Sequence, residues 1–145
     1  MYAHILIASD GSELGGRAVE QGLTLAKALG SRVTALTVTE PWTAAVSGEW
    51  AVAFPVEDYE RAAAANAGKI LAHVSEAAAR IGVKCDTVHV QDQFPAEGIV
   101  AEAKERACDL IVMGSHGRRG LARFVLGSQA TRVLTHSTTP MLICR

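Results

Sequence analysis

Two kinds of hydrophobic pattern alternate along the chain. Short apolar runs are followed by longer stretches in which apolar residues recur every three or four positions. The runs are typical of buried strands, and the longer stretches are typical of amphipathic helices that cover a sheet. We therefore predict five strands, at residues 4–9, 33–39, 83–90, 110–113 and 141–144. Alternation of this kind favours an α/β fold with a parallel sheet.

Four helices are predicted in the remaining segments. The turn signal that ends in Ser12 caps the first helix, and Gly30 can end it. The second helix has up to about 25 residues, roughly 38 Å at a rise of about 1.5 Å per residue, and ends near Gly82. Pro95 suits the first turn of the third helix, and Ser128 caps the fourth.

Residues 40–56 interrupt this regularity with two prolines, a glycine and both tryptophans, so we predict a long connection that partly covers another feature. The other elements follow each other as βα units, whose parallel connections are expected to be right-handed. Ligands of such open sheets bind beyond the carboxyl ends of strands, where the strand order reverses. The segments after the first and fourth strands are the most polar and glycine-rich, which makes them the candidate site.

The length of 145 residues, with 49% hydrophobic and 20% charged residues, indicates one folded domain, residues 1–145, rather than a disordered chain. No apolar run approaches the roughly 18 residues of a membrane span, and the N-terminus lacks the features of a signal peptide. We expect a soluble cytoplasmic protein. The three cysteines form no C-x-x-C motif and lie in apolar surroundings, so we expect buried, reduced thiols.

The formal net charge of −1 conceals an uneven distribution. Residues 1–109 carry all 15 acidic residues and nine basic ones, whereas residues 110–145 carry five arginines and no acid. Overall neutrality argues against a nucleic-acid partner, because such binding needs a broad basic surface. The arginines instead favour a local anion site in the last quarter of the chain.

The segment 114–120 reads Gly-Ser-His-Gly-Arg-Arg-Gly, and a further glycine, Gly127, follows at the predicted start of the fourth helix. Glycines let backbone N–H groups approach an anion, and a helix N-terminus adds unpaired donors and the positive end of its dipole. Several amides with an arginine could hold a polyphosphate without a lysine clamp. A surface loop with solvated arginines is the alternative that the spacing alone leaves open.

Other site chemistries lack their motifs. The chain has no G-x4-G-K-[ST] loop, no G-x-G-x-x-G fingerprint after a strand and no G-x-S-x-G elbow. Four of the five histidines are dispersed along the chain without the spacing of metal ligands, so no metal centre is expected.

Gly114, Gly117, Gly127 and Ser128 fit the pattern G-x2-G-x9-G-[ST], which resembles the ATP-binding signature of the universal stress protein family. The likeness covers nearly the whole chain and includes Ser9-Asp10-Gly11-Ser12, Thr37-Val38 and the close Val133-Leu134-x-His136-x-x-x-Pro140. It implies a single-domain, Rossmann-like open sheet of five parallel strands in the order 3-2-1-4-5, with helices on both faces. In this family the fifth strands pair across a twofold axis, which implies a homodimer and would cover the apolar edge at residues 141–144.

The resemblance also implies a set of nucleotide contacts. Those expected at the adenosine are Ala8, Ser9, Asp10, Val38, Met113 and Gly114. Within this group Asp10 would lie near the adenine and ribose, and the backbone around Val38 would meet the adenine. Those expected around the phosphates are Ser115, His116, Gly117, Arg118, Arg119, Gly120, Gly127, Ser128 and Gln129.

Some of these residues have a second interpretation, and two positions near them depart from the commonest family pattern. Asp10 could simply cap the first helix, and His116 could be an exposed loop residue. The departures are Thr37, where histidine often precedes the valine, and Gln129, where a small apolar residue is frequent. Both bear on nucleotide preference rather than on the phosphate donors.

We therefore expect an ATP-binding universal stress protein, with Mg²⁺ on the phosphates, that acts as a homodimeric regulatory or sensing module without a membrane or nucleic-acid partner. Slow or no hydrolysis is expected, because the loop holds no obvious base and no second carboxylate accompanies Asp10. Two alternatives remain: an ATPase or nucleotidyl-transfer enzyme that uses the same phosphate loop, and a nucleotide-independent interaction protein.

Overall fold

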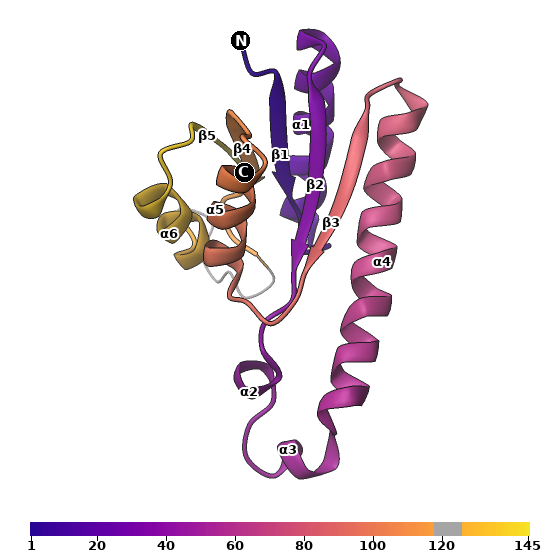
Figure 1. The fold of residues 1–145 in the computed structure, drawn as a ribbon, viewed down its shortest axis with the longest axis vertical. Coiled ribbons are helices and arrows are strands. Elements are labelled where there is room, and N and C mark those ends of the chain that lie inside the picture. The colour runs from indigo at the N-terminus through magenta and orange to yellow at the C-terminus, as the bar shows by residue number, and fades with distance from the viewer. Residues whose placement is uncertain (118–125) are drawn as a thin grey trace.

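Five parallel strands form one sheet in the order β3-β2-β1-β4-β5 (Figure 1). The structure is a computed structural model that describes residues 1–117 and 126–145. In this part of the chain the strands are β1 (His4–Ala8), β2 (Arg32–Val38), β3 (Cys85–Val90), β4 (Leu110–Gly114) and β5 (Met141–Cys144). The predicted α/β fold and its strand order are confirmed.

Helices cover both faces of the sheet (Figure 1). They are α1 (Glu13–Leu29), α2 (Trp42–Ala45), α3 (Trp50–Ala53), α4 (Val56–Arg80), α5 (Pro95–Glu105) and α6 (Ser128–His136). Residues of α1 and α4 join one apolar cluster, and residues of α5 and α6 join a second cluster on the opposite face. Among the described residues, no helix combines the length and the hydrophobicity that crossing a bilayer requires.

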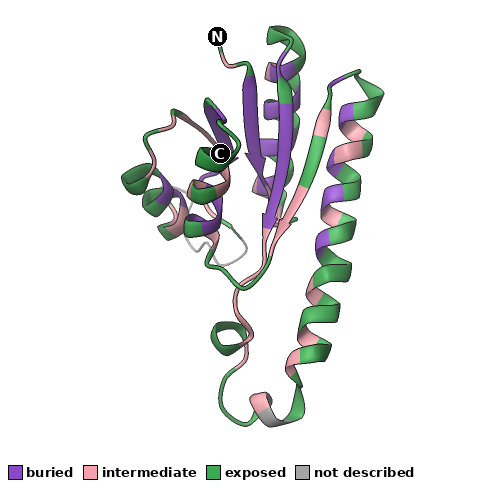
Figure 2. Cartoon of the chain, viewed as in Figure 1, coloured by how far each residue is buried: buried purple, intermediate pink, exposed green. Residues whose placement is uncertain are grey.

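Burial is greatest in the middle of the sheet (Figure 2). Every residue of β1 and of β4 is buried, whereas β3 at one edge has none that is fully buried. This is the pattern expected of a parallel sheet that is covered on both faces. Of the three cysteines, Cys108 and Cys144 are buried and Cys85 is half-buried, and all three are free thiols. Burial raises the pKa of the Cys108 thiol to about 11.

The predicted helix boundaries hold with one exception. Ser12 caps α1, because its hydroxyl accepts the N–H of Gly15, and Gly30 ends that helix in the left-handed conformation at φ 69°. At α6 the cap is Gly127, which has extended backbone, and Ser128 is already the first helical residue. The prediction that Ser128 caps this helix was therefore wrong by one position.

Two connecting segments add to the comparison with the predictions. Residues 40–56, predicted to be a long connection, link β2 to α4 and contain the short helices α2 and α3, and the Trp42 indole N–H donates to the carbonyl of Phe54 at 2.9 Å. The third strand begins at Cys85 and not at Val83, because the Val83 N–H donates to the carbonyl of Ala78 and so extends the end of α4. The 25-residue length of α4 agrees with the prediction.

The first helix packs unusually close to the first strand. A Cβ at Gly22 of α1 would lie 2.6 Å from Cδ1 and 2.9 Å from Cγ1 of Ile7, which is fully buried in β1. Atoms do not approach this closely without repulsion, so only a glycine lets α1 rest on the sheet at this depth. The position of β1 relative to α1, and with it the loop that joins them, depends on this contact.

Gly22→Ala is therefore expected to lower the free energy of unfolding by about 1–3 kcal/mol, since an extra methyl overpacks the core. Gly68→Ala in α4 is the matched control, because a Cβ there would meet no atom within 4 Å. The control is expected to raise stability by about 0.5–1 kcal/mol through helix propensity alone. Urea denaturation measures both variants, and equal stabilities would contradict the proposed contact.

Candidate functional site

The strands β1 and β4 separate at their carboxyl ends. They remain paired from Ile5 with Leu110 to Ile7 with Val112. Beyond this point Ala8 stays in register with β2, whereas the end of β4 stays in register with β5. The order of the sheet reverses between these two strands, so the split opens at the place where open α/β sheets bind ligands.

A small inner cavity of about 110 Å³ lies within this split. Its walls are mostly apolar side chains from the face of the sheet that α5 and α6 cover, namely Ala8, Leu36, Val38, Ile99 and Met113. Ser9, Asp10 and Gly114 line it as well. The cavity therefore offers a narrow apolar pocket with polar groups at its mouth.

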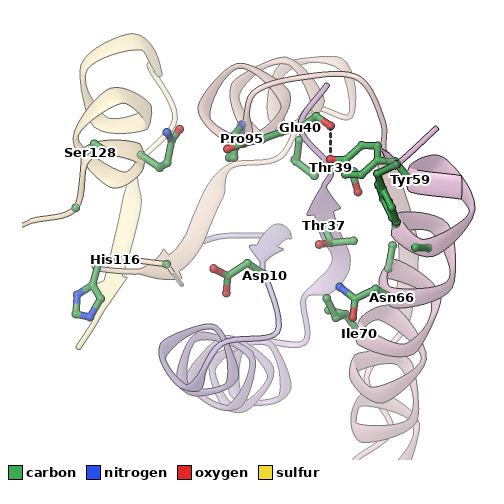
Figure 3. Close-up of a pocket in the computed structure, with 18 residues that line it drawn as sticks. Asp10, Thr37, Thr39, Glu40, Tyr59, Asn66, Ile70, Pro95, His116 and Ser128 are labelled. Carbon is green, nitrogen blue, oxygen red and sulfur yellow. Dashed lines mark hydrogen bonds between the residues drawn. The ribbon is translucent and has the colours of Figure 1, made fainter. Parts of the chain in front are cut away.

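A larger cleft of about 570 Å³ adjoins the inner cavity, and the two share Asp10, Val38, Pro95, His116, Gly117 and Gln129 among their lining residues (Figure 3). One side of the cleft carries His116 and Ser128, and the opposite side is the N-terminal half of α4 with Tyr59 and Asn66. Asp10 lies between the two sides. The cleft thus spans the carboxyl edge of the sheet from α6 to α4.

Backbone atoms crowd around the Asp10 carboxylate. Its Oδ1 accepts the N–H of Ser12 at 2.9 Å, and a Cβ at Gly15 would lie 3.0 Å from the same oxygen. A Cβ at Gly117 would lie 2.6 Å from Oδ2. Asp10 therefore supports the start of α1 and also lines the cleft. The two glycines bring the loops after β1 and β4 together at this carboxylate.

A second close approach fixes the start of α6. The N–H of Gly127 donates to the carbonyl of Ser115 at 2.6 Å, and the N–H of Ser115 donates to the carbonyl of Cys144 at 2.7 Å. A Cβ at Gly127 would lie 2.8 Å from the Ser115 carbonyl oxygen and 2.9 Å from Cα of His116. No side chain caps α6, whose first residues line the cleft, so the unpaired amides of its first turn make that end of the cleft electropositive.

The structure brings most of the predicted contact residues together. Eleven of them line the inner cavity or the cleft: Ala8, Ser9, Asp10, Val38, Met113, Gly114, His116, Gly117, Gly127, Ser128 and Gln129. Ser115 lines neither cavity and is buried behind the loop. Arg118, Arg119 and Gly120 lie outside the described residues.

The sequence did not indicate the α4 side of the cleft. The lining residues missed there are Phe54, Tyr59, Ala62, Ala63, Asn66, Ala67 and Ile70, together with Thr37, Thr39 and Glu40 at and after the end of β2. Glu40 is a second acidic residue of the cleft lining beside Asp10, and the sequence did not indicate it. The length of α4, which exceeds that of the strands it covers, is the one signal that could have pointed to this wall.

Hydrogen bonds fix this side of the cleft. The Tyr59 hydroxyl donates to the carbonyl of Glu40 at 2.7 Å, and the Thr39 hydroxyl lies 2.7 Å from Nε2 of His89. Burial lowers the pKa of His89, so the imidazole is neutral near pH 7. These contacts attach the end of β2 both to α4 and to the edge strand β3.

The described lining residues include carboxylates but no lysine or arginine. Arg132 of α6 is paired with Glu97 of α5 and lines neither the cleft nor the inner cavity. No group of three or more potential metal-binding side chains is present in the described part of the chain. Positive potential for an anion therefore comes, within this part, from the first turn of α6.

Comparison with known sequences places the chain next to one family. The sequence profile described as the universal stress protein family matches residues 1–145. The universal stress protein YxiE of Bacillus subtilis is 34% identical over 149 residues, which cover all of both chains.

Solved structures share the fold. The universal stress protein UspA from Lactobacillus plantarum superposes with a TM-score of 0.85 at 23% identity, covering 99% of this chain and 98% of that one. A universal stress protein in complex with cAMP has a TM-score of 0.69 at 24% identity, covering 98% and 95% of the two chains. The protein from Archaeoglobus fulgidus in complex with dAMP has a TM-score of 0.71 at 20% identity, covering 99% and 98%.

Gln129 joins the two helices next to the cleft, because its Oε1 accepts the N–H of Ala96 in the first turn of α5 at 3.1 Å. Gln129→Leu is expected to lower the free energy of unfolding by about 1 kcal/mol, since it leaves this buried amide without an acceptor. Gln129→Glu retains the acceptor beside two helix N-termini and is expected to be at least as stable as the wild type. Urea denaturation that finds the two variants equally stable would contradict this role.

Proposed function

Because the chain belongs to the universal stress protein family, we propose that it binds an adenine nucleotide, and specifically ATP, in the cleft between β1 and β4. The observation that carries the proposal is the sequence of environments along the cleft. An apolar cavity, a carboxylate and a helix N-terminus follow one another, and these suit a base, a ribose and a phosphate chain in that order. The relatives solved with cAMP and dAMP support this choice of ligand class.

The base is proposed to occupy the inner cavity, where Val38 offers it a polar edge. The N–H of Ser9 donates to the carbonyl of Leu36, and the N–H of Thr39 donates to the carbonyl of Val90. Since peptide groups alternate sides along a strand, the N–H and C=O of Val38 face the gap beyond the end of β1. One donor beside one acceptor matches a ring nitrogen and the N6 amino group of adenine.

The ribose and the phosphates are proposed to continue toward α6. Asp10 accepts hydrogen bonds from ribose hydroxyls, and the first-turn amides at Ser128 and Gln129 donate to the phosphate oxygens. His116 and Gly117 line the same path. Ser115, which supports the loop from behind, and Arg118, Arg119 and Gly120 belong to the proposed phosphate loop by their position in the glycine motif.

Mg²⁺ is proposed to arrive with the nucleotide. It is commonly held by substrate phosphates, water and one or two carboxylates, and Asp10 supplies one carboxylate at the proposed ribose position. The described residues offer no larger set of ligands, which suits a cation that the phosphates carry. When bound, the ion would neutralise charge on the phosphate chain.

We propose a regulatory or sensing module with slow or no hydrolysis. The contacts described above hold a ligand by backbone amides and one carboxylate, which gives affinity without activating water. His89 is neutral, but it is hydrogen-bonded to Thr39 and is not among the residues that line the cleft. An ATPase or nucleotidyl-transfer enzyme would instead need a base at the phosphates, and among the described residues the imidazole on that path is His116. Loss of any ATP turnover in His116→Ala would favour this alternative.

Isothermal titration of the wild-type protein with ATP and Mg²⁺ is expected to give saturable binding, with GTP at least about tenfold weaker because its base presents a different donor pattern. Gly117→Ala should weaken ATP binding, since its methyl would intrude on Oδ2 of Asp10. Gly16→Ala is the control, because a Cβ there meets no atom within 4 Å.

Thermal denaturation provides a second measurement. ATP at about 100 times its Kd should stabilise the wild type and Gly16→Ala by about 2.7 kcal/mol and Gly117→Ala by less. If the wild type shows no heat of binding with ATP up to about 1 mM, the proposed function is wrong. A Kd above this value corresponds to a binding free energy weaker than about 4 kcal/mol. Equal stabilisation of all three proteins would show that ATP binds without depending on Gly117 and would contradict the proposed phosphate path. No stabilisation of any of them would favour a nucleotide-independent interaction protein.

We also propose that two copies pair through β5. This strand forms one edge of the sheet, and Met141, Leu142 and Ile143 are only half-buried there. Leu134 of the adjoining α6 is 55% exposed. An apolar edge strand is a site of unwanted pairing unless it is covered, and a second copy of the same edge covers it symmetrically.

Light scattering at micromolar concentration is expected to give a dimer for the wild type and a monomer for Ile143→Lys, because a buried lysine at the edge opposes pairing. Ile81→Lys is the matched control: Ile81 is 38% exposed at the far end of α4 and should leave the dimer intact. A wild type that is monomeric, or a dimer that survives Ile143→Lys, would contradict pairing through β5.

A further inference from the structure

The cleft branches in three directions from Asp10, and the proposed nucleotide accounts for two of them. The inner cavity leads toward α5, and the glycine segment leads toward α6. The third direction leads to Thr37 and to the wall formed by α4 (Figure 3). None of the predicted contact residues lies on this third side.

Thr37 has a hydroxyl without a protein partner. The residue is only 5% exposed, it lines the cleft, and no hydrogen bond from its side chain to any described residue exists. No fully buried side-chain nitrogen or oxygen in the described chain lacks a partner, so the hydroxyl must be the part of Thr37 that reaches the cleft. Figure 3 shows it on the side that faces Asp10.

The location of Thr37 follows from strand alternation. Val33 and Ala35 pack on the face of β2 that α4 covers, so Thr37 lies on that face too. At this height α4 presents Asn66, whose carboxamide projects from the helix toward the cleft (Figure 3). Ile70 and Ala67 complete the wall. A hydroxyl and a carboxamide therefore stand together on a mostly apolar surface.

We propose that Thr37, assisted by Asn66, recognises the 2′- and 3′-hydroxyl groups of the bound nucleotide, so that this side of the cleft selects ribonucleotides. The inference rests on the proposed function. A ribose has three directions of its own: the base leaves from C1′, the phosphate chain from C5′, and the hydroxyls from the C2′–C3′ edge. With the base in the inner cavity and the phosphates at α6, the hydroxyl edge faces the remaining direction.

Charge agrees with this assignment. The groups near the third direction are the Asp10 and Glu40 carboxylates, the Thr37 hydroxyl and the Asn66 amide, and no described basic residue lines it. Such groups accept hydrogen bonds from neutral hydroxyls, and the hydroxyl and the amide can also donate them. Asp10 would accept from one ribose hydroxyl, and Thr37 would exchange a hydrogen bond with the other.

The test compares the Kd of ATP with that of 2′,3′-dideoxy-ATP, which lacks both hydroxyls. The wild type is expected to prefer ATP. Thr37→Val should weaken ATP binding by about fivefold, as the loss of one neutral hydrogen bond does, and leave dideoxy-ATP unchanged. Asn66→Ala should reduce the preference for ATP by less. The Asn66 carboxamide is exposed in the wild type, so water competes for its hydrogen bond to the ribose.

Thr37→Ser retains the hydroxyl and should keep the preference of the wild type, which separates a lost hydrogen bond from altered packing. Thr87→Val makes the same substitution on β3 outside the cleft and should change neither affinity. The inference is overturned if Thr37→Val weakens the binding of both ligands equally or of neither. It is also overturned if the wild type binds ATP and dideoxy-ATP with the same Kd. If the wild type binds neither ligand, the proposed function fails and the inference with it.

Discussion

The pairing of β1 with β4 joins two parts of the sheet that come from separate segments of the sequence. β1 to β3 come first along the chain, and β4 and β5 follow after α5. Only three register pairs, from Ile5 to Ile7 of β1, connect the two parts directly, and all of these residues are buried. If the strands stayed paired to their ends, the inner cavity would close. If fewer residues were paired, β1 and β4 would separate where their side chains belong to the apolar clusters on both faces of the sheet.

Close backbone approach, rather than reactive side chains, shapes the resulting site. Gly117 leaves room for the Asp10 carboxylate, and Gly127 leaves room for the carbonyl of Ser115. A Cβ at Gly127 would fall within 3 Å of backbone atoms of Ser115 and His116, so the neighbouring backbone requires glycine there. A Cβ at Gly117 would fall 2.6 Å from Oδ2 of Asp10, so that carboxylate would have to shift. The shape of the cleft beside Asp10 and Ser115 is therefore set by these two glycines.

The sequence predicted the fold well because its strands are continuous apolar runs and its helices carry clear end signals. Ser12 and Gly30 bound α1 as expected. Errors arose where a tertiary contact decided the local structure, as at Gly127, whose approach to Ser115 moves the helix cap by one residue. The glycine spacing located the α6 side of the cleft. It could not locate Asn66, since an exposed polar residue in an amphipathic helix looks the same whether or not a cleft lies beside it.

The length of α4 explains why that second side exists. At about 1.5 Å per residue its 25 residues reach roughly 38 Å, whereas the six residues of β3 reach about 20 Å. The fully buried residues of α4 begin only at Ala67, so the preceding part of the helix extends beyond the sheet. Contacts of Tyr59 with Glu40 and with Phe54 hold that part in place. A shorter helix would cover the same core and would leave the hydroxyl of Thr37 facing open water instead of a cleft.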